Sequence, residues 1–254
     1  MRFRTRFSIL APAMLLAGLL AAAPVRAQQP AAFSAEQKKA IESVIRDYLL
    51  QNPEVLVEAM HALEARQQEK AAAQGRAAIA AHAKEIYDDG VSYVAGNPKG
   101  DVTIVEFFDY RCGYCKQVQP HIEALLKEDR NLRVVLKELP VLGPESVTAA
   151  RAAVAALEQE KGAKYFAFHN AMMAFRGQLG EEAVLRMAKE AGLDVAKLKV
   201  AMQSPKTEAV LRANLSLADR LGIQGTPGFV IGDQLIPGAI SLDSMRELVK
   251  AQRG

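Results

Sequence analysis

Residues 102–128 carry the sequence VTIVEFFDYRCGYCKQVQPHIEALLKE, which decides the fold. Val102–Phe108 is a run of β-branched and aromatic residues and predicts a buried strand. Residues 113–129 have apolar side chains at helical spacing and predict a helix. We expect Pro120 to kink this helix rather than end it, because the apolar pattern continues beyond it. Both cysteines of the chain, Cys112 and Cys115, therefore lie where the strand turns into the helix.

The segments that follow extend this pattern into an α/β domain. Residues 132–139 read as a second strand, which completes a β-α-β unit. Residues 145–221 are almost continuously helical in pattern, residues 226–236 resemble a hairpin, and a helix ends the chain. The turn-rich residues 96–101 mark the boundary of this domain. We therefore expect a main domain over residues 101–254, with a helical insertion at about residues 144–222.

The spacing of the two cysteines favours redox chemistry. A disulfide across four residues closes so small a ring that it stabilises a fold very little. A structural zinc site needs about four ligands, and none of the four histidines is spaced as a partner for the cysteines. A C-x-x-C motif alone is weak, but its position at a strand-to-helix turn strengthens it. We expect no metal in the site, although two thiolates could also bind Cu(I).

The two cysteines are expected to differ in role. Cys112 should lie at the helix N-terminus, where unpaired N–H groups and the helix dipole stabilise a thiolate. Arg111 and Lys116 add positive charge there, whereas Asp109 opposes it. Cys115 falls on the same helix face. The sequence thus predicts Cys112 as the exposed nucleophile and Cys115 as the buried resolving thiol.

Two charged residues in the predicted strands are further candidates. Glu106 lies between apolar neighbours six residues before Cys112. It is either a surface residue or a buried carboxyl with a raised pKa that can transfer protons. Lys137, in the second strand, is a candidate counter-charge to Glu106. Both groups are more often solvated.

Thr226-Pro227 opens the late hairpin. Thr226 is a candidate substrate-binding residue, and Pro227 is a candidate catalytic residue. Most X–Pro bonds in folded proteins are trans. A cis bond would leave the Thr226 backbone free to pair with an extended substrate beside the cysteines. The residues alone favour neither isomer.

The segment before the main domain predicts two amphipathic helices. Ser34 and Gln37 have the spacing of a capping box. Apolar residues then recur at helical spacing in two stripes, at positions 41, 44, 45, 48 and 49 and at positions 55, 56, 59, 60 and 63. These helices either pack on the main domain or pair with copies of themselves. Periodicity alone favours neither alternative. We assign residues 28–66 to an N-terminal helical segment, whose oligomerisation role is implied by the family resemblance described below, and residues 67–100 to a helical linker that Gly75 could interrupt.

The first residues have the layout of a secretory signal peptide. Arg2, Arg4 and Arg6 precede an apolar run over residues 9–23, and cleavage is expected after Ala27. A retained membrane anchor is disfavoured because this run is short. The whole chain has 32 Lys+Arg and 29 Asp+Glu. Residues 1–27 hold four arginines and no acid, so the remaining chain has a net charge of −1, which gives no support for nucleic-acid binding.

The motif residues resemble those of a known family. Residues 105–116, VEFFDYRCGYCK, and the late Gly225-Thr226-Pro227 resemble the DsbA-like periplasmic thiol–disulfide oxidoreductases. Residues 48–56, YLLQNPEVL, resemble the ScsC-like branch, linked to suppression of copper sensitivity. The resemblance implies a thioredoxin fold with an inserted helical domain, Pro227 in cis, Cys112 as nucleophile and a buried Glu106/Lys137 pair. It also implies a periplasmic homo-oligomer, with a trimer favoured.

The resemblance also bears on the type of disulfide chemistry. Gly113-Tyr114 and the threonine before Pro227 depart from a typical DsbA oxidase and are similar to DsbC-type isomerases. We therefore expect a disulfide isomerase or reductase that acts on unfolded or misoxidised secreted proteins, with Gly113, Tyr114 and Thr226 contacting substrate. A membrane thiol reductase of the DsbD type would keep it reduced. The alternatives are a dithiol oxidase recharged by a DsbB-type partner and a Cu(I)-binding copper-tolerance protein.

Overall fold

The computed structural model describes residues 33–159 and 162–254. The signal peptide predicted for residues 1–27 lies outside these described residues. The chain divides into two units, one that ends at Met60 and one that comprises His61–Gly254. Helix α2 (Glu54–Ala81) contributes residues to both units.

The first unit contains α1 (Ala35–Gln51). Ser34 caps this helix as predicted, because its hydroxyl accepts the Gln37 N–H at 3.2 Å while the Gln37 side chain accepts the Ser34 N–H at 2.9 Å. These reciprocal bonds satisfy two N–H groups that a helix start leaves unpaired. No residue of α1 is buried. Its apolar stripe therefore stays exposed at Ile41, Val44, Ile45 and Tyr48.

A five-stranded mixed sheet forms the centre of the second unit. Its strands are β1 (Tyr93–Gly96), β2 (Val102–Phe108), β3 (Leu132–Glu138), β4 (Gly228–Ile231) and β5 (Gln234–Pro237). Their order is β1-β3-β2-β4-β5. Strands β2 and β3 are parallel, and the other neighbours are antiparallel.

Helices cover both faces of this sheet. The helices α4 (Gly113–Glu128) and α10 (Leu242–Ala251) pack on one face with Ile104 and Phe108. The other face, with Val105 and Phe107, is covered by the end of α2, by α3 (Ala83–Tyr87) and by α9 (Pro205–Arg220). Because successive strand residues point to opposite faces, each buried strand supplies both layers of the core.

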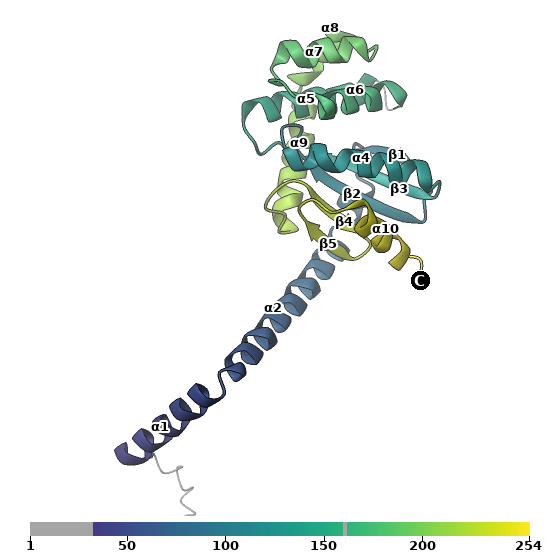
Figure 1. The fold of residues 1–254 in the computed structure, drawn as a ribbon. Helices are drawn as coiled ribbons and strands as arrows, with labels where there is room; N and C mark the ends of the chain where they lie inside the picture. The colour runs from purple at the N-terminus through teal and green to yellow at the C-terminus, as the bar shows by residue number, and fades with distance from the viewer. Residues whose placement is uncertain (1–32, 160–161) are drawn as a thin grey trace, which may run out of the picture. The chain divides into compact units, whose positions relative to one another are not determined.

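Within the described residues, five helices are inserted between β3 and β4. They are α5 (Pro144–Gln159), α6 (Ala163–Ala174), α7 (Glu181–Glu190), α8 (Val195–Met202) and α9 (Pro205–Arg220). Figure 1 shows α5–α8 stacked beyond α4, with α9 leading the chain back to the sheet. No helix in the described ranges has the length and apolar character needed to cross a membrane.

This architecture confirms the predicted thioredoxin fold with an inserted helical domain and preceding helices, and it also differs in detail from the prediction. Strand β1 lies inside the range predicted as a helical linker and pairs with β3. A four-residue edge strand carries too little pattern to be recognised. Helix α2 continues through Gly75 and ends before His82. Helix α4 continues through Pro120 as predicted.

The predicted Glu106/Lys137 pair is wrong. Glu106 is opposite Leu136 in the parallel β2–β3 register, so Lys137 faces the other side of the sheet. There the Lys137 ammonium lies 2.6 Å from the Asp89 carboxylate and donates to the Ser92 hydroxyl at 3.1 Å. Burial alone would raise the pKa of Asp89, but the charge and hydrogen bonds of Lys137 and Ser92 outweigh it and lower the pKa.

We predict that Lys137→Met destabilises the fold without changing the reactivity of Cys112. The substitution leaves the Asp89 carboxylate without its ammonium partner, which costs about 3 kcal/mol in the free energy of unfolding. Urea denaturation measures this loss, and Lys137→Met/Asp89→Asn is the control that removes both charges and should recover part of it. Since the pair lies across the sheet from Glu106, the alkylation rate of Cys112 should stay within about twofold. A tenfold change in that rate would show that Lys137 acts on the active-site charge.

Candidate active site

The two cysteines lie at the start of α4. Cys112 is the N-cap of this helix, with an extended backbone and no side-chain capping bond. Its N–H donates to the Asp109 carbonyl at 3.0 Å, and its own carbonyl accepts the Lys116 N–H at 3.1 Å. Both cysteines are free thiols. Cys112 is 6% exposed and Cys115 is fully buried, so Cys112 is the more accessible sulfur but less exposed than the sequence predicted.

The loop before β4 partly covers Cys112. Gly228 pairs with Phe107 in the antiparallel β2–β4 register, which brings the preceding residues beside the end of β2. The Thr226-Pro227 bond is cis, as the resemblance implied. The Cys112 thiol donates to the Thr226 carbonyl at 3.1 Å. The residue expected to bind the substrate backbone therefore contacts the reactive sulfur directly.

The pKa of the Cys112 thiol is lowered to about 5. The largest cause is the hydrogen bond from the Cys115 thiol, which stabilises the thiolate. Burial opposes this shift, and the Thr226 side chain and the N–H groups of Cys115 and Tyr114 add to it. A pKa near 5 means that Cys112 is almost entirely thiolate at neutral pH, the form that attacks disulfides.

The neighbouring cations do not act as the sequence analysis expected. The Arg111 guanidinium lies 3.1 Å from the Glu145 carboxylate. The Lys116 ammonium donates to the Phe175 carbonyl. Both cations are thus engaged elsewhere, and hydrogen bonds at the helix start supply the main stabilisation of the thiolate.

Cys115 has the opposite electrostatic environment. Its pKa is raised well above that of an ordinary thiol, first because the thiol donates a hydrogen bond to Cys112, and then because it is buried and faces the charge of Glu106. Cys115 therefore stays protonated until the Cys112 thiolate has been consumed. This order suits a resolving thiol that acts second.

Glu106 is a buried carboxyl without a partner. It is fully buried, and neither of its oxygens has a hydrogen-bond partner among the residues that the structure describes. Burial, followed by the charge on Cys112, raises its pKa to about 8. Because its charge raises the pKa of Cys115 in turn, a neutral Glu106 eases ionisation of Cys115. The carboxyl can therefore hold or accept a proton at the step in which Cys115 attacks.

Asp109 organises the active-site turn, a role that the sequence analysis missed. One oxygen of its buried carboxylate accepts the Arg111 N–H at 2.7 Å. The other accepts the N–H groups of Val141 and Leu142 at 2.9 and 3.1 Å. The first bond is a local aspartate turn that a sequence can suggest. The other two join loops that are distant in sequence.

Tyr110 and His169 form a second structural contact beneath the turn. The Tyr110 hydroxyl lies 3.0 Å from His169 Nδ1, and His169 Nε2 lies 3.4 Å from the Gln119 side-chain oxygen. Burial lowers the pKa of His169 to about 3, so the ring is neutral at pH 7. This contact fixes the segment before Cys112 against helix α6 of the insertion.

Most of the predicted site residues come together. Cys112, Cys115, Thr226 and Pro227 meet at the turn, and Glu106 couples electrostatically to both cysteines, whereas Lys137 lies on the other face. A Cβ added to Gly113 would meet no atom within 4 Å, and Tyr114 is 63% exposed, so both positions are open to a partner. Within the described residues, no three His, Cys, Asp or Glu side chains are grouped to hold a metal ion.

We predict that Cys115→Ala raises the pKa of Cys112, because it removes the hydrogen bond that contributes most to the shift. In the wild type, alkylation of Cys112 by iodoacetamide should fall with a midpoint near pH 5 as the thiolate is protonated. In the variant this midpoint should move upward. Absorbance of the thiolate at acid pH gives an independent measure. An unchanged midpoint would mean that Cys115 does not stabilise the thiolate.

We predict that Glu106→Gln stabilises the reduced protein in a pH-dependent way. The carboxyl has a pKa of 4.5 in the unfolded chain and about 8 in the folded one. The carboxyl therefore does not lower the free energy of unfolding below pH 4.5. It lowers this free energy increasingly between pH 4.5 and 8, and by a constant amount above pH 8. The gain from the variant should grow over that window by up to about 1.4 kcal/mol per pH unit.

Urea denaturation of the reduced protein across this pH range measures the gain. Glu247→Gln, at an exposed position of α10, controls for the loss of one negative charge. A stability difference between Glu106→Gln and the wild type that does not vary with pH would contradict the raised pKa.

Two family models match the chain. A DsbA-like thioredoxin domain matches residues 103–250, and the N-terminal domain of copper resistance protein ScsC matches residues 37–70. The first match covers the two cysteines, the Thr226-Pro227 loop and the inserted helices. The second covers α1 and the first part of α2.

Solved structures agree with these matches. A thioredoxin-like oxidoreductase from Silicibacter pomeroyi DSS-3 is 42% identical, with a TM-score of 0.64 over 67% of this chain and 96% of that one. Proteus mirabilis ScsC in a transitional conformation is 31% identical, with a TM-score of 0.65 over 87% of this chain and 97% of that one.

One curated relative is named as an antiporter. The chain is 28% identical over 164 residues to Na(+)/H(+) antiporter NhaA 3 of Salinispora tropica, which is 64% of this chain and 25% of that protein. The chain thus spans a quarter of the length of that relative.

The family models, the solved structures and the paired cysteines at the start of α4 together show that the chain belongs to the DsbA-like thioredoxin family of thiol–disulfide oxidoreductases and carries an ScsC-type N-terminal segment.

Proposed function

We propose that this protein is a periplasmic thiol–disulfide exchange enzyme that isomerises or reduces disulfides in secreted proteins. The observation that carries the proposal is the contrast between the two thiols. Cys112 is held as a thiolate at neutral pH, while Cys115 is buried and protonated behind it. Cys112 can therefore attack a substrate disulfide while Cys115 is still protonated and unreactive.

The proposed cycle begins when the Cys112 thiolate attacks one sulfur of a substrate disulfide. A bond forms between Cys112 and that sulfur, the substrate disulfide breaks, and the other substrate sulfur leaves as a thiolate. In isomerisation, this thiolate attacks a different disulfide of the same substrate, and a substrate thiolate finally displaces Cys112. The electron count of the enzyme is then unchanged.

Reduction follows when Cys115 resolves the mixed disulfide. Cys115 loses its proton, which the ionised form of Glu106 can accept because the two groups interact electrostatically, and attacks the Cys112 sulfur. The Cys112–Cys115 disulfide forms, and the substrate leaves with two added electrons. A dithiol donor must then return the pair to thiols, and we assign this role to a membrane thiol reductase of the DsbD type.

Two features favour isomerisation over oxidation. Gly113-Tyr114 and Thr226 are similar to the corresponding residues of DsbC-type isomerases, and both the Thr226 carbonyl and the Tyr114 N–H contact the Cys112 sulfur. The unburied apolar stripe of α1 also suits self-association, and several active sites in one assembly would favour reshuffling. The alternative is a dithiol oxidase recharged by a DsbB-type partner.

A copper role is the second candidate. The matching N-terminal model is described as part of a copper resistance protein, and two closely spaced thiols are soft ligands that suit Cu(I). Tight Cu(I) binding by the reduced wild type, lost in Cys112→Ala, would favour this candidate if thiol–disulfide exchange proved negligible.

We predict that the reduced enzyme reactivates scrambled ribonuclease in a glutathione buffer and that Cys112→Ala reduces this activity to the uncatalysed rate. Cys115→Ala should retain part of the isomerase activity, because resolution is needed only for reduction. Reactivated ribonuclease activity gives the rate, and oxidative refolding of reduced ribonuclease gives the comparison. Rapid oxidation without any reactivation of the scrambled substrate would establish the oxidase alternative instead.

We predict that the wild type is an oligomer, with a trimer favoured, and that Val44→Asp converts it to a monomer. The substitution places a charge in the exposed apolar stripe of α1, where Val44 is 68% exposed. Val200→Asp, at a position of α8 that is 76% exposed, is the matched control and should leave the mass unchanged. Light scattering after size-exclusion chromatography reports the mass. A monomeric wild type would exclude this role for α1.

A further inference from the structure

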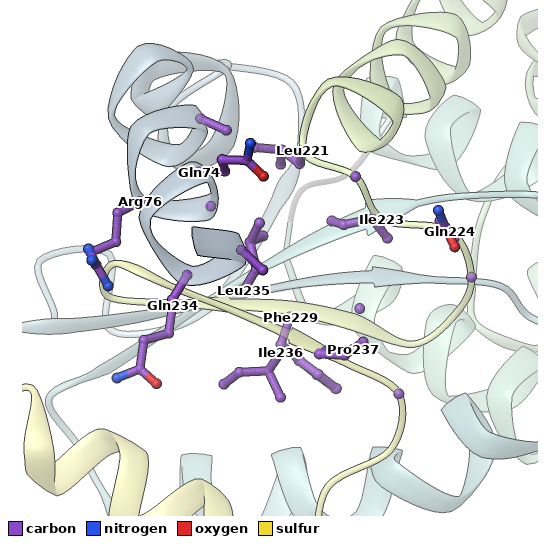
Figure 2. A pocket seen from close by; sticks show the side chains of 18 of the residues that line it. Gln74, Arg76, Leu221, Ile223, Gln224, Phe229, Gln234, Leu235, Ile236 and Pro237 are labelled. Carbon is purple, nitrogen blue, oxygen red and sulfur yellow. The ribbon is translucent and has the colours of Figure 1, made fainter. Parts of the chain in front are cut away.

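A groove runs along the sheet face that is covered by the end of α2. Its volume is about 960 Å³, within the range of ligand-binding pockets. One wall is α2, the other is the end of α9 with the loop of residues 221–225 that follows it, and β5 lies between them. Figure 2 shows Gln74 and Arg76 on the first side, Ile223 and Gln224 on the other, and Leu235 between them. All of these elements belong to the unit His61–Gly254.

The lining of the groove combines apolar and amide side chains. Ile223, Leu235 and Pro237 supply apolar surface. Four glutamines also line it: Gln68, Gln74, Gln224 and Gln234. A glutamine amide both donates and accepts hydrogen bonds, so it can pair with the N–H and C=O groups of any peptide.

The charges around the groove are mixed in sign. Arg76 and Arg220 line it together with Asp219 and Asp233. This balance does not favour an anionic ligand such as a phosphate. An uncharged, amide-bearing ligand fits the lining better.

The groove extends to the loop that contacts the reactive sulfur. Thr226 and Pro227 also line it, and the Thr226 carbonyl is the group that contacts the Cys112 thiol at 3.1 Å. Added Cβ atoms at Gly222, Gly225 and Gly238 would meet nothing within 4 Å, so this end of the groove is open. A chain whose cysteine is joined to Cys112 could enter the groove directly from Thr226.

We propose that this groove binds an extended segment of the polypeptide substrate on one side of its reactive cysteine. The proposal rests on the proposed exchange function. It adds a second contact with the substrate, in a groove that has helix α2 as one wall. The glutamines pair with the substrate backbone, and the apolar surface receives its side chains. Recognition through the backbone is independent of sequence, as a substrate class of unfolded proteins requires.

Helix α2 offers a test with a matched control. The residues of α2 that form the inner wall recur at helical spacing, at Gln68, Ala71, Ala72 and Gly75. Ala72→Trp therefore fills the groove without removing a polar contact. Ala73→Trp places the same side chain on the adjacent exposed position, which does not line the groove.

Two substrates separate groove binding from the chemistry of the cysteines. The first is 5,5′-dithiobis(2-nitrobenzoate), which reaches Cys112 without occupying the groove. The second is a pair of disulfide-bonded peptides extended by six residues on the amino or the carboxyl side of the cysteine. One extension should raise kcat/KM relative to the unextended peptide, and Ala72→Trp should lower that value about tenfold. The small disulfide should react equally with wild type, Ala72→Trp and Ala73→Trp.

Equal rates of Ala72→Trp and Ala73→Trp with the extended peptides would overturn the groove and leave the exchange function intact. Failure of the wild type with the small disulfide as well would instead overturn the exchange function. A benzophenone amino acid at position 72 locates the occupant. In a Cys115→Ala mixed disulfide it should crosslink to the peptide, with none formed from position 73. Crosslinking only to a second copy of the chain would contradict the proposal.

Discussion

The chemistry of this protein depends on the hydrogen bonds that hold Cys112 as a thiolate. The Cys115 thiol contributes most, and Thr226 and the first N–H groups of α4 contribute the rest. Arg111 and Lys116 are not among the main causes of this shift, and each contacts another group. The same hydrogen bond that lowers the pKa of Cys112 raises that of Cys115. One contact thus separates the attacking thiol from the resolving thiol.

The rest of the fold keeps this contact in place. Strand β2 leads into the cysteine turn, and its antiparallel pairing with β4 brings Thr226 beside the turn across more than one hundred residues of sequence. Asp109 ties the turn to the loop after β3, and Tyr110 ties it to His169 in the insertion. Both oxygens of Glu106 are buried without a hydrogen-bond partner in the described part of the chain, which lowers the stability of the fold. A destabilising group in the core supports a functional role, here proton transfer.

Local patterns predicted the parts of this site that are local in sequence. The strand, the turn and the helix around Cys112 follow from residue type and spacing. The residues alone left Glu106 open between a surface position and a buried one, and only the family resemblance implied that it is buried. The predicted pairing of Glu106 with Lys137 was wrong because the side of the sheet on which a side chain lies depends on the register between strands. In this register Leu136, not Lys137, is opposite Glu106. Strand β1 was missed because four edge residues carry little signal. The contacts from Asp109 to Val141 and from Tyr110 to His169 join segments whose proximity exists only in the folded chain.

The equilibrium reduction potential of the Cys112/Cys115 couple tests the central claim most directly. Stabilising the Cys112 thiolate stabilises the reduced state, so the couple should be more oxidising than an ordinary dithiol. Equilibration of the wild type with glutathione buffers at pH 7 should give a value between about −270 mV, as for thioredoxin, and about −120 mV, as for DsbA. A potential at or below about −270 mV would contradict the account, because the thiolate would then contribute nothing to the stability of the reduced enzyme.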